Sequence, residues 1–441
     1  MTLRKWAVRA APVLAMPVVV MAAGGAQAGG FGLREQSSYY QGTAFAGNAA
    51  GGEGLASMFW NPAALSFTPG LSVEQNITYI APHASVDVFS AGAPITGANL
   101  GNLGVGDIVD NGTLPTGYAS YAWDKWAVGV GITSPYGLVT DATCNWSGRY
   151  YGCYNRIFDV NVQGSVAYRV NDWLTLGAGV NVNYIEAKLT GAQVLGVVPA
   201  MPPIVVSGYS QVEGEDYGFG FNLGALFTLA PGTTLGIGYR SFIDQTITGQ
   251  LGLSGRGQVI PPLSATAPLT LPDQVTASFR SQVTPQWTLL GTVEWTNWST
   301  VQQLVVSSAA GQSTLDLKWN DGWFFSGGVE YQWDPKLALR AGLAYELTPV
   351  PDDTRSPRLP DTNRLWLSGG FTYNFTQQFS MDFAYSHIFG ETSPITLLPT
   401  DPANVTRGSL IGQVSDGYVD IVSVALRYKF GATTEAALIT K

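Results

Sequence analysis

The chain has 441 residues, of which 12% are charged, 12% are aromatic and 53 are glycine. A water-soluble domain carries about 25% charged residues, so this balance argues against a soluble enzyme and favours a surface that contacts lipid. The net charge of −9 also argues against a nucleic-acid partner, because neutralising phosphates requires clusters of basic side chains.

Residues 1–28 have the features of a secretory signal. An apolar stretch at positions 10–23 follows three basic residues, and Ala26-Gln27-Ala28 is a small-x-small cleavage site. The apolar stretch is short and contains two prolines, which argues against an N-terminal membrane helix. We therefore expect a mature chain that begins at Gly29, with a net charge near −12 because three of the 22 basic residues and none of the 31 acidic ones are removed.

Strict alternation of apolar and polar residues dominates the rest of the chain. In 158–170 the apolar set from Phe158 to Val170 interleaves with polar residues such as Asn161 and Gln163. No uninterrupted apolar run approaches the ~18 residues that a membrane-spanning helix needs. Export combined with this pattern predicts an all-β fold, a transmembrane β-barrel that presents apolar side chains to lipid and polar ones to the lumen.

The alternation predicts fourteen antiparallel strands. We place them at 71–82, 116–123, 125–134, 157–170, 173–189, 212–229, 233–251, 271–284, 286–298, 321–333, 336–347, 363–375, 378–389 and 415–430.

Short and long connections alternate between these strands. Turn-forming residues fill the short ones, as in Asn171-Asp172 and Asp334-Pro335, whereas the long ones cover 83–115, 135–156, 190–211, 252–270, 299–320, 348–362 and 390–414. Outer-membrane barrels have short periplasmic turns and long outer loops. This predicts a transmembrane barrel over 71–430 with both ends periplasmic, rather than a soluble β-sandwich, and leaves a tail at 431–441 without an assigned role.

Residues 29–70 contain no clear strand. They are rich in Gly and Ala, carry few charges, and include the compact apolar stretch MFWNPAAL at 58–65. A flexible leader is one interpretation. We favour a plug inside the lumen, because irregular backbone is tolerated at membrane depth where protein surrounds it.

The chain resembles the FadL-type outer-membrane transporters of long-chain fatty acids and hydrocarbons over nearly its whole mature length. The resemblance depends on the order of these elements: Phe31, Glu35-Gln36-Ser37, Asn61-Pro62-Ala63, Ile132 to Leu138, Tyr239-Arg240-Ser241, and the run from Thr348 to Ser368.

This resemblance implies a fourteen-stranded barrel blocked by an N-terminal hatch that includes Phe31. Asn61, Pro62 and Ala63 would lie against an inward kink of the third strand. The kink would fall at Ser134, Pro135 and Gly137, because proline cannot donate to a ladder. An apolar molecule captured by the loops and bound in the lumen would then leave sideways into the membrane, without a cofactor or an energy source.

The resemblance also implies a ligand site in the lumen. Lys318 falls where the family often carries a lysine, and Arg240 is the second candidate contact for a fatty-acid carboxylate. Gly191 stands where another basic residue would be expected. The ligand is therefore either a long-chain fatty acid or a neutral hydrocarbon.

The expected location is the outer membrane of a Gram-negative bacterium, with contacts to lipid and lipopolysaccharide. The last strand ends in Tyr428 and Phe430, similar to terminal strands that the barrel-assembly machinery recognises. We expect a monomer.

Cys144 and Cys153 enclose eight residues of a long loop, CNWSGRYYGC. In an oxidising exterior they are expected to form a disulfide. A metal site is not expected there, because neither histidine of the chain lies in the loop.

Two other function classes are alternatives to a hydrophobic transporter. A hydrolase would need a nucleophile, a base and an orienting group, and only His387, on the lipid-facing side of its strand, suggests one; we therefore predict no catalytic residues. A porin for polar solutes is the more serious alternative, but its pore would require charged constriction rings, and charges on the lumen-facing side are sparse.

Overall fold

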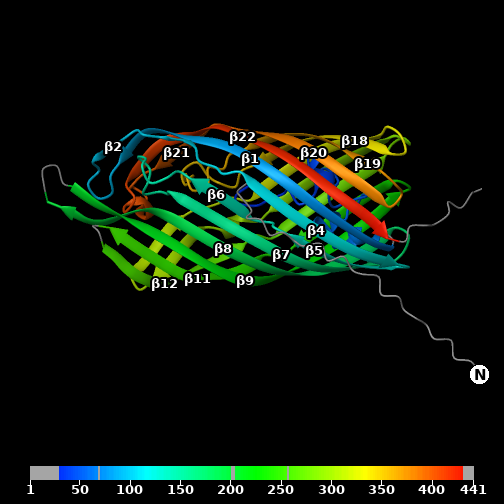
Figure 1. The fold of residues 1–441 in the computed structure, drawn as a ribbon, viewed down its shortest axis with the longest axis horizontal. Helices are drawn as coiled ribbons and strands as arrows, with labels where there is room; N and C mark the ends of the chain where they lie inside the picture. Colours follow the sequence, from blue (N-terminus) through cyan, green and yellow to red (C-terminus); the bar gives the residue numbers. More distant parts are fainter. Residues whose placement is uncertain (1–28, 68–69, 200–203, 256–257, 431–441) are drawn as a thin grey trace, which may run out of the picture.

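The computed structural model describes residues 29–67, 70–199, 204–255 and 258–430. Its strands form one antiparallel sheet that closes on itself. Closure occurs where β1 (Gly70–Gly92) pairs with β22 (Ser409–Phe430), from Leu71 opposite Phe430 to Gly92 opposite Ser409. The result is the elongated barrel of Figure 1.

The other elements have the following bounds. The helices are α1 (Ser38–Gln41), α2 (Ser57–Trp60), η1 (Pro62–Phe67), η2 (Trp298–Thr300) and η3 (Pro402–Asn404). The remaining strands are β2 (Asn99–Gly101), β3 (Val105–Asp107), β4 (Gly112–Trp123), β5 (Trp126–Thr133), β6 (Gly137–Asp141), β7 (Tyr154–Arg169), β8 (Leu174–Val198), β9 (Ile204–Ala230), β10 (Thr233–Arg240), β11 (Ile243–Gly255), β12 (Gln258–Leu271), β13 (Gln274–Gln282), β14 (Trp287–Thr296), β15 (Gln303–Ser308), β16 (Gly311–Asp316), β17 (Gly322–Gln332), β18 (Leu337–Leu347), β19 (Arg364–Asn374), β20 (Phe379–Gly390) and β21 (Ser393–Leu397).

Fourteen wall strands account for this sheet, which confirms the predicted strand number. β2 and β3 are short strands within the first long connection. Six wall strands are interrupted, so that each carries two labels: β5/β6, β10/β11, β12/β13, β14/β15, β16/β17 and β20/β21.

Three connections predicted as long loops, 190–211, 252–270 and 299–320, are instead mainly strands; in the last of them β15 and β16 pair from Gln303 opposite Asp316 to Ser308 opposite Gly311. β8 and β9 stay paired as far as Val198 opposite Ile204, and β11 and β12 as far as Gly255 opposite Gln258. Of these hairpins, the one formed by β8 and β9 projects beyond the rest of the barrel (Figure 1). Both faces of the β8–β9 hairpin are partly exposed near its tip, so its sequence has no buried face and lacks the alternation that marks the wall.

Side chains of the wall alternate between lipid and lumen as predicted. On β7, Val162 and Val166 point outward and are exposed, whereas Asn161 and Gln163 point inward and are buried. None of the described helices has the length and apolar character required to cross a membrane.

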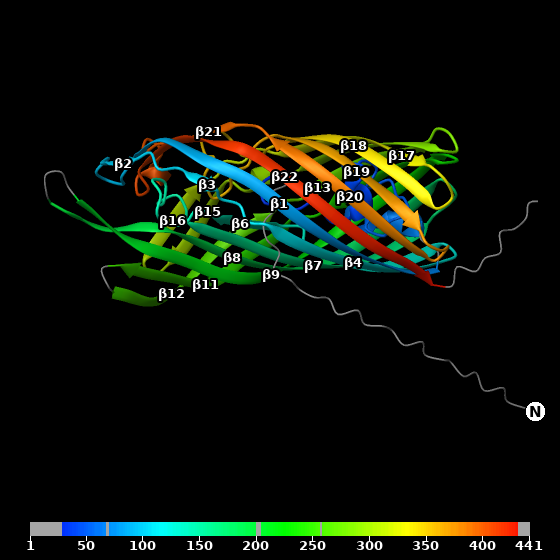
Figure 2. The same ribbon diagram turned by 45° about the horizontal axis from the view of Figure 1, so that its top comes forward.

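Residues 29–67, called here the luminal segment, lie inside the ring of strands, where Figure 2 shows them in blue. α1 packs against β19, β20 and β22, and η1 against β7, β8 and β9. α1 begins after Ser37, whose hydroxyl accepts a hydrogen bond from the backbone N–H of Tyr40 at 3.3 Å. Nearly every residue from 29 to 65 is buried, so the segment packs as part of the interior.

Candidate functional site

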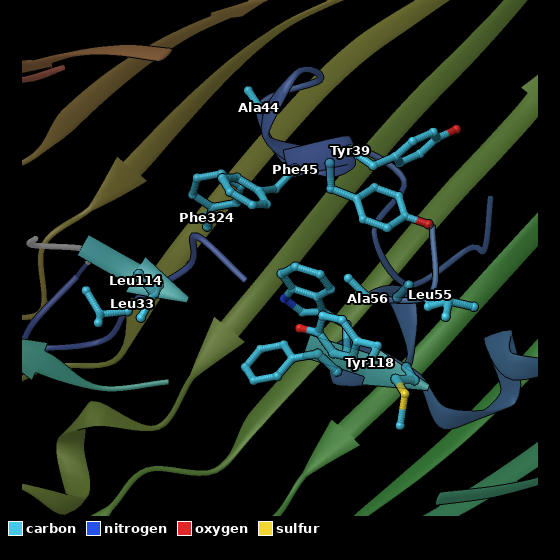
Figure 3. Packing of buried hydrophobic residues seen from close by; sticks show 14 of the residues in the cluster. Leu33, Tyr39, Ala44, Phe45, Leu55, Ala56, Leu114, Tyr118 and Phe324 are labelled. Carbon is cyan, nitrogen blue, oxygen red and sulfur yellow. The ribbon is translucent and has the colours of Figure 1, made fainter. Parts of the chain in front are cut away.

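An aromatic core fixes the luminal segment within the barrel (Figure 3). Trp60 of α2 is in contact with Tyr40 and Phe59, with ring centroids 5.8 and 5.0 Å apart. Phe45 contacts Trp366 of β19 at 6.0 Å. The stretch 58–65 lacks alternation because the protein surrounds it on all sides.

Asn61 ends α2 and is fully buried. Its Nδ2 donates to the carbonyl of Ala49 at 2.7 Å and to that of Ala225 on β9 at 3.0 Å. Its Oδ1 accepts from the backbone N–H of Ala63 at 3.0 Å. One side chain therefore joins two parts of the luminal segment to the wall, and Pro62 begins η1 immediately after it.

The Asn61-Pro62-Ala63 stretch lies at a different part of the wall from the one predicted. It packs on glycines of three neighbouring strands: Gly177 of β8, Gly224 of β9 and Gly238 of β10. A Cβ at any of these glycines would overlap the stretch or the adjoining Trp60 carbonyl. The prediction that this triplet lies against the kink of the third strand is therefore wrong: its close approach is to β8–β10, where the absence of side chains leaves room for backbone.

The third wall strand is interrupted between β5 and β6, at Ser134 to Tyr136. Here the luminal segment takes the place of a neighbouring strand. Leu33 donates its N–H to the carbonyl of Pro135 at 2.7 Å, and Gly137 donates to the carbonyl of Phe31 at 2.9 Å. The Gln36 amide completes the contact, since it donates to the Ser134 carbonyl at 2.8 Å and accepts from the Ser134 N–H at 3.2 Å.

The second and third wall strands separate at this point. Their ladder ends at Gly117 opposite Ile132, although β4 continues down to Gly112 paired with β1 alone. Thr116 and Tyr118 of β4 donate their hydroxyls to the carbonyl of Gln36, at 3.1 and 2.9 Å. The luminal segment thus bonds to both sides of an interruption in the wall.

Phe31 lies at this interruption within a group of aromatic rings. Its ring centroid is 4.9 Å from Trp298, 5.7 Å from Tyr136 and 5.8 Å from Trp319. A cavity adjoins this group, and its lining includes Arg34, Phe59, Pro135, Tyr136, Arg240 and Trp298. It contains about 640 Å³ of space not occupied by atoms, part of it open to solvent.

Arg240, at the end of β10, is the basic residue of this cavity that lacks an acidic partner. Its Nη1 donates to the carbonyl of Phe59 at 3.2 Å and to Gln163 at 3.1 Å, and the guanidinium lies 4.2 Å from the centroid of the Phe59 ring. The side chain is buried and forms no ion pair with any described carboxylate. A buried cation without a counterion favours an anionic ligand.

A cluster of five buried charged side chains surrounds the start of the luminal segment. Arg34 pairs with Glu294 of β14 and, at 3.2 Å, with Glu346 of β18. Arg364 of β19 pairs with Asp361 and lies 4.0 Å from Glu346. The neighbouring Glu35 is buried, neither of its carboxyl oxygens has a hydrogen-bond partner, and burial raises its pKa to about 7.

The structure does not bring Lys318 to the cavity. Its side chain is half exposed beyond β16, with Nζ 3.1 Å from Asp401 and 3.5 Å from Asp316. The hydrogen bond to Asp401 raises the pKa of Lys318, whereas the pKa of Asp401 is lowered, first by the Ala403 N–H. In the same outer region, Cys144 and Cys153 are joined by a disulfide, with Cα atoms 5.1 Å apart.

Sequence reasoning missed Arg34, Gln36 and Trp298 as functional residues. Gln36 belongs to the Glu35-Gln36-Ser37 motif, but nothing in the sequence indicates that its amide would bond to the backbone of Ser134, 98 residues away. Trp298 ends a predicted strand, and its inward turn in η2 has no signature in the alternation. Arg34 could have been recognised from the sequence as a candidate site residue, because it is the sole basic residue of the luminal segment.

Comparison with known proteins agrees with this architecture. The profile of the family described as outer membrane protein transport protein (OMPP1/FadL/TodX) matches residues 19–430. The chain is 29% identical to the long-chain fatty acid transport protein of Escherichia coli O6:H1, over 83% of this chain and 88% of that one. It is 28% identical to outer membrane protein P1 of Haemophilus influenzae, over 93% and 97%.

Solved structures show the same fold. A Pseudomonas aeruginosa FadL homologue superposes with a TM-score of 0.83 at 24% identity, covering 91% of this chain and all of that one. The toluene transporter TbuX of Ralstonia pickettii gives a TM-score of 0.67 at 20% identity, covering 91% and 99%. The chain belongs to the OMPP1/FadL/TodX family of outer-membrane transport proteins.

Proposed function

We propose that this outer-membrane protein takes up long-chain fatty acids or related hydrocarbons by passive diffusion. The ligand is captured by the outer loops, binds in the cavity beside Phe31 and Arg240, and leaves sideways through the interruption at Ser134 to Gly137. Relatives named for long-chain fatty acid transport and a fold shared with toluene transporters support this class of substrate.

The observation that carries the lateral route is the set of backbone bonds at the interruption. Phe31, Leu33 and Gln36 bond to Pro135, Gly137 and Ser134, where a neighbouring wall strand would otherwise bond. In this proposal the luminal segment is a hatch, and a shift of residues 31–36 opens the wall toward lipid. The cavity shares Pro135 and Tyr136 with that opening, so the ligand has a short path to it.

Energetics favour lateral release over release into water. Burying each CH₂ group is worth ~0.8 kcal/mol, so the transfer of a C16 to C18 chain into water would cost more than about 10 kcal/mol. Entering the hydrocarbon of the membrane costs little, since one apolar environment replaces another. No coupled energy source is needed.

A reversible crosslink across the interruption tests this mechanism. In the double variant Gln36→Cys, Ser134→Cys, a short thiol-specific crosslinker with a reducible bond should join the hatch to the wall and abolish uptake of radiolabelled oleate, and reduction should restore it. The control pair Ser368→Cys, Ser386→Cys joins two wall strands whose hydroxyls lie 2.7 Å apart, and should not affect uptake. Wild-type uptake by the fully crosslinked first variant would refute lateral release at this site.

We further propose that Arg240 binds the carboxylate when the ligand is a fatty acid. Arg240→Gln should weaken binding of oleate to the detergent-solubilised protein about tenfold or more, because a charge-assisted bond is lost in a buried site. Binding of a neutral alkane of the same length should change little, and Arg240→Lys should restore part of the oleate affinity. Equal losses for acid and alkane would contradict this role.

The surroundings of the barrel complete the proposal. The exposed apolar side chains of the wall contact outer-membrane lipid and, in the outer leaflet, lipopolysaccharide. The barrel acts as a monomer, and the assembly machinery recognises β22 with its terminal Phe430.

A further inference from the structure

The buried charge cluster at the start of the luminal segment is unbalanced. Within the described residues it contains three carboxylates and two guanidinium groups, none more than 9% exposed: Glu294, Glu346, Asp361, Arg34 and Arg364. Glu35 adds no compensating charge, because a buried carboxyl without partners favours its neutral form. One positive charge is therefore missing from a site where an unpaired carboxylate is costly.

The backbone nitrogens of the first two described residues point at these carboxylates. The nitrogen of Gly29 lies 2.9 Å from Oε1 of Glu346, and that of Gly30 lies 2.9 Å from Oδ2 of Asp361. Both contacts are buried. Gly29 is also the residue that follows the predicted cleavage site Ala26-Gln27-Ala28.

We propose that Glu346 forms a binding site for the protein's own N-terminal α-ammonium group, which is created when the signal is removed. A signal peptidase uses one water molecule to break the C–N bond between Ala28 and Gly29. The oxygen of water goes to the Ala28 carbonyl carbon, which becomes a carboxylate, and the nitrogen of Gly29 keeps its single hydrogen and gains the two hydrogens of the water, so that it becomes an ammonium. That ammonium supplies the missing charge, so the cluster becomes neutral.

The local geometry favours a chain that ends at this point. Gly30 has a φ of +66°, and a Cβ there would lie 3.0 Å from the Trp298 ring. A Cβ on Gly29 would lie 3.3 Å from Oε1 of Glu346 and 3.6 Å from Pro349. Two glycines directly after the cleavage site therefore let the chain start fit between an aromatic ring and a carboxylate.

The site also positions the hatch. Arg34 and the ammonium both bind Glu346, and Phe31 and Leu33, which bond to the interrupted strand, lie between them. Removal of the signal would thus fix both ends of the stretch that closes the wall. This inference requires cleavage before Gly29, but it does not require that the protein transports any ligand.

Amine labelling of the folded, detergent-solubilised mature protein tests the proposal. Reductive dimethylation at pH 7, followed by mass spectrometry of the peptides, measures how fast the α-amine reacts relative to Lys125, which lies in an exposed turn. We expect the α-amine of Gly29 to react at least tenfold more slowly than Lys125 in the folded protein, although a free α-amine is the less basic and more reactive group. Unfolding should abolish the protection.

Two variants and a control identify the partner. A Gly-Ser insertion between Ala28 and Gly29 moves the amine by about 7 Å of extended chain and should make it as reactive as Lys125. Glu346→Gln should also increase its reactivity. Glu330→Gln removes a different carboxylate that accepts a hydrogen bond from Tyr39 of the luminal segment, so it controls for general loosening and should leave the amine protected.

Several results would overturn the inference. These are a mature protein that does not begin at Gly29, an α-amine that reacts as fast as Lys125 in the folded wild type, or protection that survives both the insertion and Glu346→Gln. If the amine is protected and the variant crosslinked between positions 36 and 134 still transports oleate, the ammonium site is supported and lateral release is refuted, so the two proposals fail separately.

Discussion

Replacing Asn61 should loosen the luminal segment without unfolding the barrel. In Asn61→Ala the carbonyls of Ala49 and Ala225 and the N–H of Ala63 all lose a buried partner. Each buried hydrogen bond lost costs about 1 kcal/mol, so the loss of three should make local opening easier by about 3 kcal/mol. At 1.4 kcal/mol per factor of ten, this corresponds to roughly 100-fold faster exchange of the affected amides.

Hydrogen exchange measured by mass spectrometry can follow this change. Peptides covering residues 44–65 should exchange faster in Asn61→Ala, whereas peptides of β22 should keep their protection. Asn61→Asp retains the acceptor for Ala63 but places a carboxyl oxygen against the carbonyls of Ala49 and Ala225 in a buried site, so we expect an effect at least as large as that of Asn61→Ala. Asn145→Ala, in an exposed loop, is the control. An increase of less than about fivefold in the folded Asn61→Ala protein would show that Asn61 does not hold the segment.

Three further predictions concern the luminal segment and the outer loops. Deletion of residues 29–67 should turn a silent protein into one with large, steady conductance in planar bilayers; a conducting wild type would favour a porin. Burial raises the pKa of Glu35 from its ordinary value near 4.5 to about 7. The free energy that favours the closed luminal segment should therefore fall by up to about 3 kcal/mol as the pH rises from 4.5 through 7. Glu35→Gln should remove this dependence, as followed by protease sensitivity of residues 29–67 at pH 5 and 8, and an unchanged profile would refute it. Cys144→Ser with Cys153→Ser should destabilise the outer loop by roughly 2 to 3 kcal/mol, seen as faster amide exchange confined to 141–156.

The wall strands could be predicted because each residue type depends only on which face of the strand the residue occupies. Each residue of β7 faces either lipid or lumen, so Val162 and Asn161 reveal their environments by type alone. The rule fails where both faces of a strand meet solvent, as near the tip of the β8–β9 hairpin, and the sequence there was interpreted as loop. The interruption at Pro135 was predictable for a similar reason, since a proline cannot donate to a ladder.

The partners of the luminal segment could not be predicted from local pattern. Asn61 bonds to backbone atoms of Ala225, 164 positions away, and a backbone carbonyl leaves no mark in the sequence. Arg240 was identified as a candidate, but its lack of an acidic neighbour depends on how three strands and α2 come together. Lys318 shows the converse, because a basic residue in a suitable region proved to have two acidic partners of its own.

Glycines on the inner face of the wall make the barrel and its N-terminal segment a matched pair. Gly238 accommodates the Trp60 carbonyl and Gly342 the backbone of Thr43, so an alanine at either position would collide with the segment. Exchanging the first forty mature residues with those of a distant relative should therefore yield poorly seated chimeras, even where the barrels superpose well. A change in the luminal segment must therefore be matched by a change in the barrel, because glycines on the inner face of the wall determine where the segment can pack.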